Sequence, residues 1–137
     1  PDAATFWISG FSFGAWISLQ LLMRRPEIEG FVAVSPPANM YDFTFLSPCP
    51  RSGLIVQGDE DSIVDENTVR KLADKLNAQR DIEIDYRMIH GADHFFRGLI
   101  DELNENLMQY IKVYSEPLKK RGRIKLDKKR RQLPKTS

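Results

Sequence analysis

The chain has 137 residues, of which 42% are hydrophobic and 28% charged, a length and composition that predict one globular domain around one core. No apolar run is long enough to span a membrane, and the single cysteine excludes an internal disulfide framework and fits a reducing compartment. The first ten residues lack the basic start and cleavage site of a secretory signal, so we expect a cytoplasmic protein.

The net charge of +1 conceals two segments of opposite sign. Residues 1–117 carry 10 basic and 18 acidic side chains, a net charge of −8. Residues 118–137 carry 10 basic side chains and one acid, a net charge of +9, and have too few apolar residues to form a core. We therefore expect a folded body over residues 1–117 and a basic, disordered tail over residues 118–137.

The folded body alternates between short apolar runs, which are typical of buried strands, and segments that are typical of amphipathic helices. The predicted elements are, in chain order, a strand at residues 4–10, a helix at 12–25, a strand at 30–37, a loop at 38–52, a strand at 53–59, a helix at 65–80, a strand at 82–89, a loop at 90–96 and a helix at 96–114. This alternation predicts an α/β fold, a parallel sheet with helices on both faces.

Three details mark the helices. Pro26 ends the first helix, because proline cannot continue a helix interior, and Asp65 is a good N-cap for the second. The third helix is expected to bury one apolar stripe, formed by Ile100, Leu103, Leu107, Ile111 and Tyr114.

Residues 10–14, Gly-Phe-Ser-Phe-Gly, lie between the first predicted strand and the first predicted helix. Gly-x-Ser-x-Gly in this position is typical of a nucleophile elbow, in which Ser12 projects from a sharp, strained turn. Gly10 and Gly14 are expected to remove Cβ atoms that would collide with the neighbouring strand and helix. The helix would direct backbone N–H groups and its positive dipole end at the reaction site. A plain turn is the alternative interpretation.

A nucleophilic serine needs a base, and the base needs a carboxylate to orient it; in this fold they follow the serine in the order acid, then histidine. His90 and His94 both follow the last predicted strand. We favour His94, which lies further into the loop, over His90, which lies at the end of the strand where its ring can pack or bond to the backbone.

The acid is expected in the loop after the third predicted strand, which offers Asp59, Glu60, Asp61, Asp65 and Glu66. Asp65 is better explained as a helix cap, and Asp59 lies very close to the strand. Asp61 is in the middle of the loop, three residues before Val64, which can anchor the loop in the core. Clusters of acids are also common on solvated surfaces, so the residues alone leave this choice open.

Four segments, GFSFGAW, VSPP, GDEDSIV and GADHFF, together resemble the α/β-hydrolase superfamily, in particular its bacterial dienelactone-hydrolase-like branch, over about residues 3–115. The resemblance implies that Ser12 is the nucleophile, Asp61 the acid and His94 the base, and that the backbone N–H of Phe13 is an oxyanion donor. Dienelactone hydrolases proper carry a cysteine nucleophile, where this chain has Ser12.

That family has further strands before the nucleophile strand, with a loop that supplies a second oxyanion N–H. The resemblance therefore implies that this chain is the C-terminal half of the domain. Its nucleophile strand would form an apolar edge, so we expect the chain to be inactive alone, or to assemble with another copy or with the missing N-terminal half.

The leading hypothesis is a serine hydrolase that cleaves an ester or related acyl bond of a small substrate through an acyl-enzyme, with neither metal nor cofactor. The alternative is a non-catalytic interaction module, or an inactive fragment, whose basic tail contacts nucleic acid or an anionic surface. That tail has no aromatic interleaving, so we expect no nucleic-acid partner, and no membrane partner. Residues 41–46 and Phe95-Phe96 are candidates for an apolar acyl pocket, and Cys49 is expected to be packed and inert.

Overall fold

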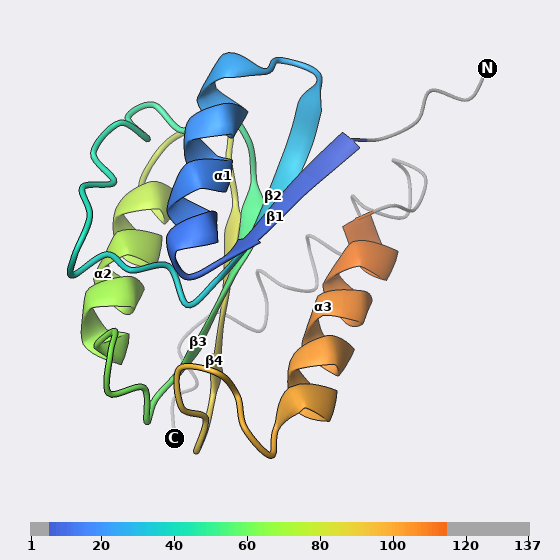
Figure 1. Ribbon diagram of the computed structural model, residues 1–137. Helices are drawn as coiled ribbons and strands as arrows, with labels where there is room; N and C mark the ends of the chain where they lie inside the picture. Colours follow the sequence, from blue (N-terminus) through green and yellow to red (C-terminus); the bar gives the residue numbers. More distant parts are fainter. Residues whose placement is uncertain (1–5, 115–137) are drawn as a thin grey trace, which may run out of the picture.

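The computed structural model describes residues 6–114 (Figure 1). Strands and helices alternate along the chain much as predicted. They are β1 (Phe6–Phe11), α1 (Phe13–Arg24), β2 (Ile28–Val34), β3 (Gly53–Gly58), α2 (Glu66–Asn77), β4 (Ile84–Ile89) and α3 (Ile100–Tyr114). The basic tail at residues 118–137 lies outside the described residues.

The strands form one parallel sheet in the order β1-β2-β3-β4. Figure 1 shows α1 and α2 on one face and α3 on the other. Two hydrophobic clusters fill the two interfaces: one contains the buried side chains of α1 and α2, and the other contains Tyr110 and Tyr114 of α3. The predicted fold class, a parallel sheet covered by helices on both faces, is confirmed.

The strands differ sharply in burial. Every residue of β3 is buried, as expected for a central parallel strand covered on both faces. β1 is not buried as its composition alone predicts, since Phe6 is 56% exposed and Phe11 41%; it is instead the apolar edge that the family resemblance implied. Within residues 6–114, β1 pairs with β2 alone and forms the edge of the sheet.

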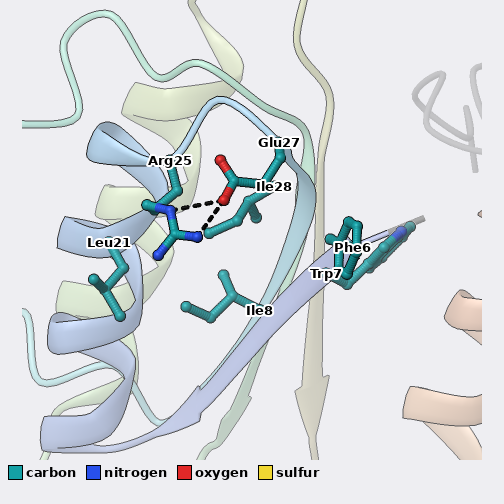
Figure 2. A pocket seen from close by; sticks show the side chains of 7 residues that line it. All are labelled: Phe6, Trp7, Ile8, Leu21, Arg25, Glu27 and Ile28. Carbon is teal, nitrogen blue, oxygen red and sulfur yellow. Dashed lines mark hydrogen bonds and ion pairs between the residues drawn. The ribbon is translucent and has the colours of Figure 1, made fainter. Parts of the chain in front are cut away.

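A groove of about 500 Å³ lies beside the start of β1 (Figure 2). It is lined by apolar side chains and by the Arg25–Glu27 ion pair: Phe6, Trp7, Ile8, Leu21, Arg25, Glu27 and Ile28. Because Ser12 follows the opposite end of β1, this groove is a feature of the sheet edge and does not belong to the site described below.

The third helix begins at Ile100 and not near Phe96 as predicted. Phe96 and Gly98 have φ values of 57° and 75°, and such left-handed residues cannot continue an α-helix. The Asp93 side chain instead accepts two backbone N–H bonds and stabilises a turn before the helix.

The predicted stripe of α3 also needs correction. Ile100 and Ile111 are 47% and 42% exposed, because the helix presents a different face to the sheet. The face against the sheet comprises Leu103, Leu107, Tyr110 and Tyr114.

The other helix boundaries follow local chemistry. α1 ends at Arg24, two residues before Pro26, as predicted. Asp65 caps α2, since its side chain accepts a hydrogen bond from the backbone N–H of Thr68 at 3.3 Å. None of the helices in residues 6–114 is long and apolar enough to cross a membrane.

Candidate active site

Ser12 lies in a strained turn between β1 and α1. Its φ of 56° and ψ of −123° are unusual for a residue with a side chain. Two main-chain hydrogen bonds hold the turn. The Ser12 N–H donates to the Val34 carbonyl at 2.8 Å, and the Ser12 carbonyl accepts from the Ala15 N–H at 2.8 Å. The serine side chain makes no capping bond to the helix. This geometry is that of a serine held outward on a sharp strand-to-helix turn.

The two glycines of the turn have different roles. A Cβ on Gly10 would lie 2.3 Å from the Gly14 carbonyl oxygen and 2.6 Å from the Ser18 hydroxyl, so only glycine fits this approach of β1 to α1. A Cβ on Gly14 would meet nothing within 4 Å among the described residues. The expected collision at Gly14 is therefore wrong for this part of the chain, because its Cβ would point into open space.

The structure brings Ser12, His94 and Asp61 together. His94 Nε2 lies 2.9 Å from Ser12 Oγ, and His94 Nδ1 lies 2.8 Å from Asp61 Oδ2. Both partners of this pair are enclosed: the side chains of His94 and Asp61 are 5% and 0% exposed. The three residues come from three loops at the carboxyl ends of the parallel strands, and Ser12 and His94 are 82 positions apart in the sequence.

The Asp61 carboxylate is fully engaged. Its Oδ1 accepts the backbone N–H groups of Ile63 and Val64, both at 2.8 Å. Its Oδ2 accepts the Gln57 side-chain amide at 2.9 Å in addition to His94. Such a carboxylate, buried with four partners, can orient an imidazole without rotating away.

The acid loop and the histidine loop are locked against each other by close backbone contact. A Cβ on Gly58 would lie 2.3 Å from the Ala92 carbonyl oxygen, so glycine is required where β3 meets the histidine loop. The same carbonyl accepts the Glu60 N–H at 2.9 Å. Ser35, buried with φ 52° at the end of β2, donates its hydroxyl to the His94 carbonyl at 3.3 Å. These contacts place His94 relative to Asp61.

The other histidine takes part in a separate, outer pair. His90 Nδ1 lies 2.7 Å from Asp59 Oδ2, and the second Asp59 oxygen accepts the Gly91 N–H at 2.7 Å. The His90 side chain is 88% exposed. The hydrogen bond to Asp59 raises the pKa of His90, while the Gly91 N–H, followed by His90, lowers the pKa of Asp59. Among the candidates for acid and base, Asp59 and His90 thus pair with each other and not with Ser12.

Aromatic side chains stand beside the histidine. The Phe11 and Phe95 rings lie 5.2 Å and 5.0 Å from the His94 ring, and 5.8 Å from each other. They remain 41% and 47% exposed, so they form an open apolar wall at the site.

A second aromatic group lies after the serine. Phe13 is 50% exposed, and its ring contacts the rings of Trp16 and Tyr41 at 5.6 Å and 5.3 Å. Trp16 stacks on Tyr41 at 4.7 Å, and its indole N–H donates to the Asp42 carbonyl.

The expected acyl-pocket residues are only partly at the site. Phe95 and Tyr41 lie in the two aromatic groups just described. Phe96 is wholly buried in the cluster on the α3 face, and Phe43 and Leu46 are buried in the opposite cluster. Phe43 and Leu46 serve the core because their loop packs against the helices of that face, and Phe96 serves it from the loop after β4.

Two residues that hold the site were not expected from the sequence, Gln57 and Ser35. The sequence did contain a feature that could have identified each of them. Gln57 is the one polar residue in an apolar strand, and Ser35 directly precedes a pair of prolines. Cys49 is buried as expected, and burial raises the pKa of its thiol. Among residues 6–114, no group of three His, Cys, Asp or Glu side chains is arranged to hold a metal ion.

Comparison with known proteins gives several relatives but no match to a family model. An uncharacterized protein of Rickettsia prowazekii (strain Madrid E) is 48% identical over 136 residues, which cover 96% of this chain and 57% of that protein. A candidate α/β hydrolase of unknown function from Agrobacterium tumefaciens is 52% identical, with a TM-score of 0.78, over 82% of this chain and 51% of that one.

An α/β serine hydrolase homologue from Coxiella burnetii is 32% identical, with a TM-score of 0.66, over 77% of this chain and 48% of that one. The chain therefore spans about half the length of the relatives that it matches.

Proposed function

We propose that this chain, which belongs to the α/β-hydrolase superfamily, supplies the nucleophile, base and acid of a serine hydrolase that cleaves an ester or related acyl bond. One observation carries the proposal: Ser12 Oγ, both ring nitrogens of His94 and Asp61 Oδ2 form a continuous chain of contacts at 2.9 Å and 2.8 Å. An arrangement of nucleophile, base and orienting acid is the requirement for activating a serine.

The first half of the reaction forms the acyl-enzyme. Ser12 Oγ attacks the acyl carbonyl carbon, and its proton passes to His94 Nε2 as the carbonyl π electrons move to the oxygen. Asp61 Oδ2 accepts the Nδ1–H of the resulting imidazolium and keeps its charge. The tetrahedral intermediate then collapses, the bond to the leaving group breaks, and His94 Nε2 returns the proton to the leaving oxygen.

The second half releases the acid. A water molecule gives a proton to His94 Nε2 and attacks the acyl carbon, and the collapse of this second tetrahedral intermediate returns the proton to Ser12 Oγ. The enzyme is then restored, and the products are an alcohol and an acid.

The developing oxyanion needs N–H donors. The Phe13 N–H, in the first turn of α1, is the donor that we assign within this chain, where the positive end of the helix dipole adds to it. The loss of one oxyanion donor typically lowers the rate by about 10²–10³-fold. Turnover by this chain would therefore depend on whether a second donor is present.

The proposal is tested with a fluorophosphonate, which reports nucleophile and base without requiring turnover. We expect intact-mass analysis of the full chain to show one adduct on Ser12, which is lost in Ser12→Ala and slowed by several orders of magnitude in His94→Gln. His90→Gln is the matched control, because it removes the other histidine of the same loop, and should label at nearly the wild-type rate. Adduct formation that survives Ser12→Ala, or a greater loss with His90→Gln, would contradict the proposal.

A further inference from the structure

We infer that Gln57 is a positioning residue of this site: its amide holds the Asp61 carboxylate in the orientation that selects the Nδ1–H tautomer of His94. The effect of Gln57 on catalysis rests on the proposed function. The contacts among Gln57, Asp61 and His94, and the tautomer of His94, do not depend on it.

The first observation is the place of Gln57. Gln57 lies on β3 and is wholly buried. In the sequence of the strand, the apolar residues Leu54 and Val56 come before it and Gly58 follows it. A polar side chain in the centre of a buried strand is uncommon and calls for partners, because the loss of hydration must be offset by hydrogen bonds.

The second observation is which atoms the amide meets. Gln57 Nε2 lies 2.9 Å from Asp61 Oδ2, and 3.2 Å from the carbonyl oxygens of Gly58 and Val64. Asp61 Oδ2 is also the oxygen that contacts His94 Nδ1. Gln57 therefore contacts the very atom that orients the histidine, and it also links that carboxylate to the far end of the acid loop.

The third observation fixes the direction of the amide. All three neighbours of Nε2 are acceptors, so exchanging the amide nitrogen and oxygen would place Oε1 against three oxygens. In the orientation observed, Gln57 Oε1 is buried and has no hydrogen-bond partner among residues 6–114. An apolar residue of similar shape would fill the same space without an unpaired carbonyl. The arrangement is explained if the donor, and not the volume, is what this position requires.

The consequence for His94 follows from geometry. Two backbone N–H groups hold Asp61 Oδ1, but rotation about the bond to the carboxylate is opposed at Oδ2 only by Gln57 and by His94 itself. With Gln57 present, Oδ2 is held as an acceptor that favours a proton on His94 Nδ1. His94 Nε2 is then left as the acceptor that faces Ser12 Oγ.

The test is Gln57→Met, which keeps the length of the side chain and removes the donor. Because the chain has two histidines, ¹H–¹⁵N NMR resolves both imidazoles, and His90→Gln assigns them. We expect the wild-type chain to show the Nδ1–H tautomer at His94 with a sharp downfield Nδ1 proton. In Gln57→Met this proton should broaden or vanish, the two tautomers should mix, and phosphonylation of Ser12 should slow about tenfold, as the loss of one ordinary hydrogen bond implies.

Gln79→Met is the matched control. Gln79 also joins two loops, through Cys49 N–H and the Leu46 carbonyl, but it lies away from the site. It should leave the His94 signal and the labelling rate unchanged. An unchanged His94 signal in a folded Gln57→Met chain would overturn the inference, whether or not the chain reacts with the phosphonate.

If Gln57→Met does not fold, the side-chain amide protons of Gln57 in the wild-type chain and in Asp61→Asn provide the test instead. We expect the side-chain amide protons of Gln57 to exchange slowly in the wild-type chain and to shift strongly in Asp61→Asn, where a neutral amide replaces the carboxylate that accepts from Gln57. Fast exchange of these protons in the folded wild-type chain would also overturn the inference. A wild-type chain that shows the His94 tautomer but does not label would count against the proposed function and leave the role of Gln57 intact.

Discussion

β1 and β3 each end in a loop that carries part of the site, but the two strands lie in different surroundings. β3 is buried throughout, and the loop after it holds Asp61 through four hydrogen bonds. β1 is half exposed, and within residues 6–114 one of its edges has no strand beside it. The turn that follows it is fixed by its own backbone and by β2.

The difference separates two requirements of the site. The acid and the histidine need a fixed mutual orientation, and buried contacts from β2, β3 and the two loops supply it. The serine needs access to a substrate, and it follows the strand at the edge of the sheet, beside the exposed rings of Phe11 and Phe13. Since the relatives are about twice as long as this chain, we propose that the open side of β1 is where the rest of a complete domain, or a second copy, packs.

The largest effect on stability is expected from adding a Cβ atom at Gly58, where β3 meets the histidine loop. Gly58→Ala would place a Cβ 2.3 Å from the Ala92 carbonyl, and should lower the free energy of unfolding by about 3 kcal/mol. Gly14→Ala, in the open first turn of α1, should instead raise it by about 0.5–1 kcal/mol. Urea unfolding of the two variants measures the contrast. An equal loss of unfolding free energy in the two variants would show that the residues around Gly14 are packed as closely as those around Gly58.

The next effect compares two residues of the site itself. Asp61→Ala removes the acceptor of four hydrogen bonds, from the Ile63 and Val64 N–H groups, the Gln57 amide and His94 Nδ1, and should cost about 2 kcal/mol of stability. Ser12→Ala removes a single contact at the site and should change stability by less than about 1 kcal/mol. Thermal unfolding of both variants provides the measurement, and a larger loss with Ser12→Ala would contradict the comparison.

The sequence predicts features that depend on neighbouring residues better than features that depend on residues far apart in the chain. Asp65 and Pro26 act on their own helices, and their effects were foreseen because the chemistry is local. The residues and their order pointed to Ser12 and favoured His94, but the choice of Asp61 rested on the family resemblance; in the structure His94 contacts both of the others. The position of Gln57 opposite Asp61 Oδ2 depends on how the loop returns to β3, which no local pattern encodes.

The same reasoning explains the errors. The apolar composition of β1 predicted burial, whereas the family resemblance predicted an apolar edge; β1 lies at the edge, because burial depends on what lies beside a strand. Phe96 fits a helical pattern by type, yet the turn at Asp93 gives it a positive φ. Gly14 belongs to a pattern in which both glycines avoid collisions, whereas in these residues only Gly10 does so.

A smaller effect distinguishes the outer His90–Asp59 pair from the buried pair of the same loops. The raised pKa of His90 means that its contribution to stability is present below its unfolded value of about 6.5 and is lost as the pH rises through the folded value. The lowered pKa of Asp59 means that its contribution is present above about 3.9 and is lost as the pH falls through the folded value.

The difference in melting temperature between the wild-type chain and His90→Gln should therefore be largest near pH 5–6 and should shrink towards pH 9. It should also shrink in high salt, because His90 is exposed. A difference that does not change with pH would exclude the ion pair as its source.

The smallest effect on stability is expected at the open edge. Phe6 is 56% exposed, so Phe6→Lys should change the free energy of unfolding by no more than about 0.5 kcal/mol. A charge on an open strand discourages pairing with another chain, so the variant should self-associate less than the wild-type chain. Sedimentation velocity at micromolar concentration measures this, and a wild-type chain that is already a monomer would argue against association through β1.

Hydrogen exchange of backbone amides tests the contrast between the two sides most directly. The account predicts that the amides of β3 exchange slowest in the chain, and that those of β1 exchange on the order of 10²-fold faster because the edge opens without unfolding the rest. Protection of β1 equal to that of β3 would contradict it, since the serine strand would then be as firmly enclosed as the strand that holds the acid.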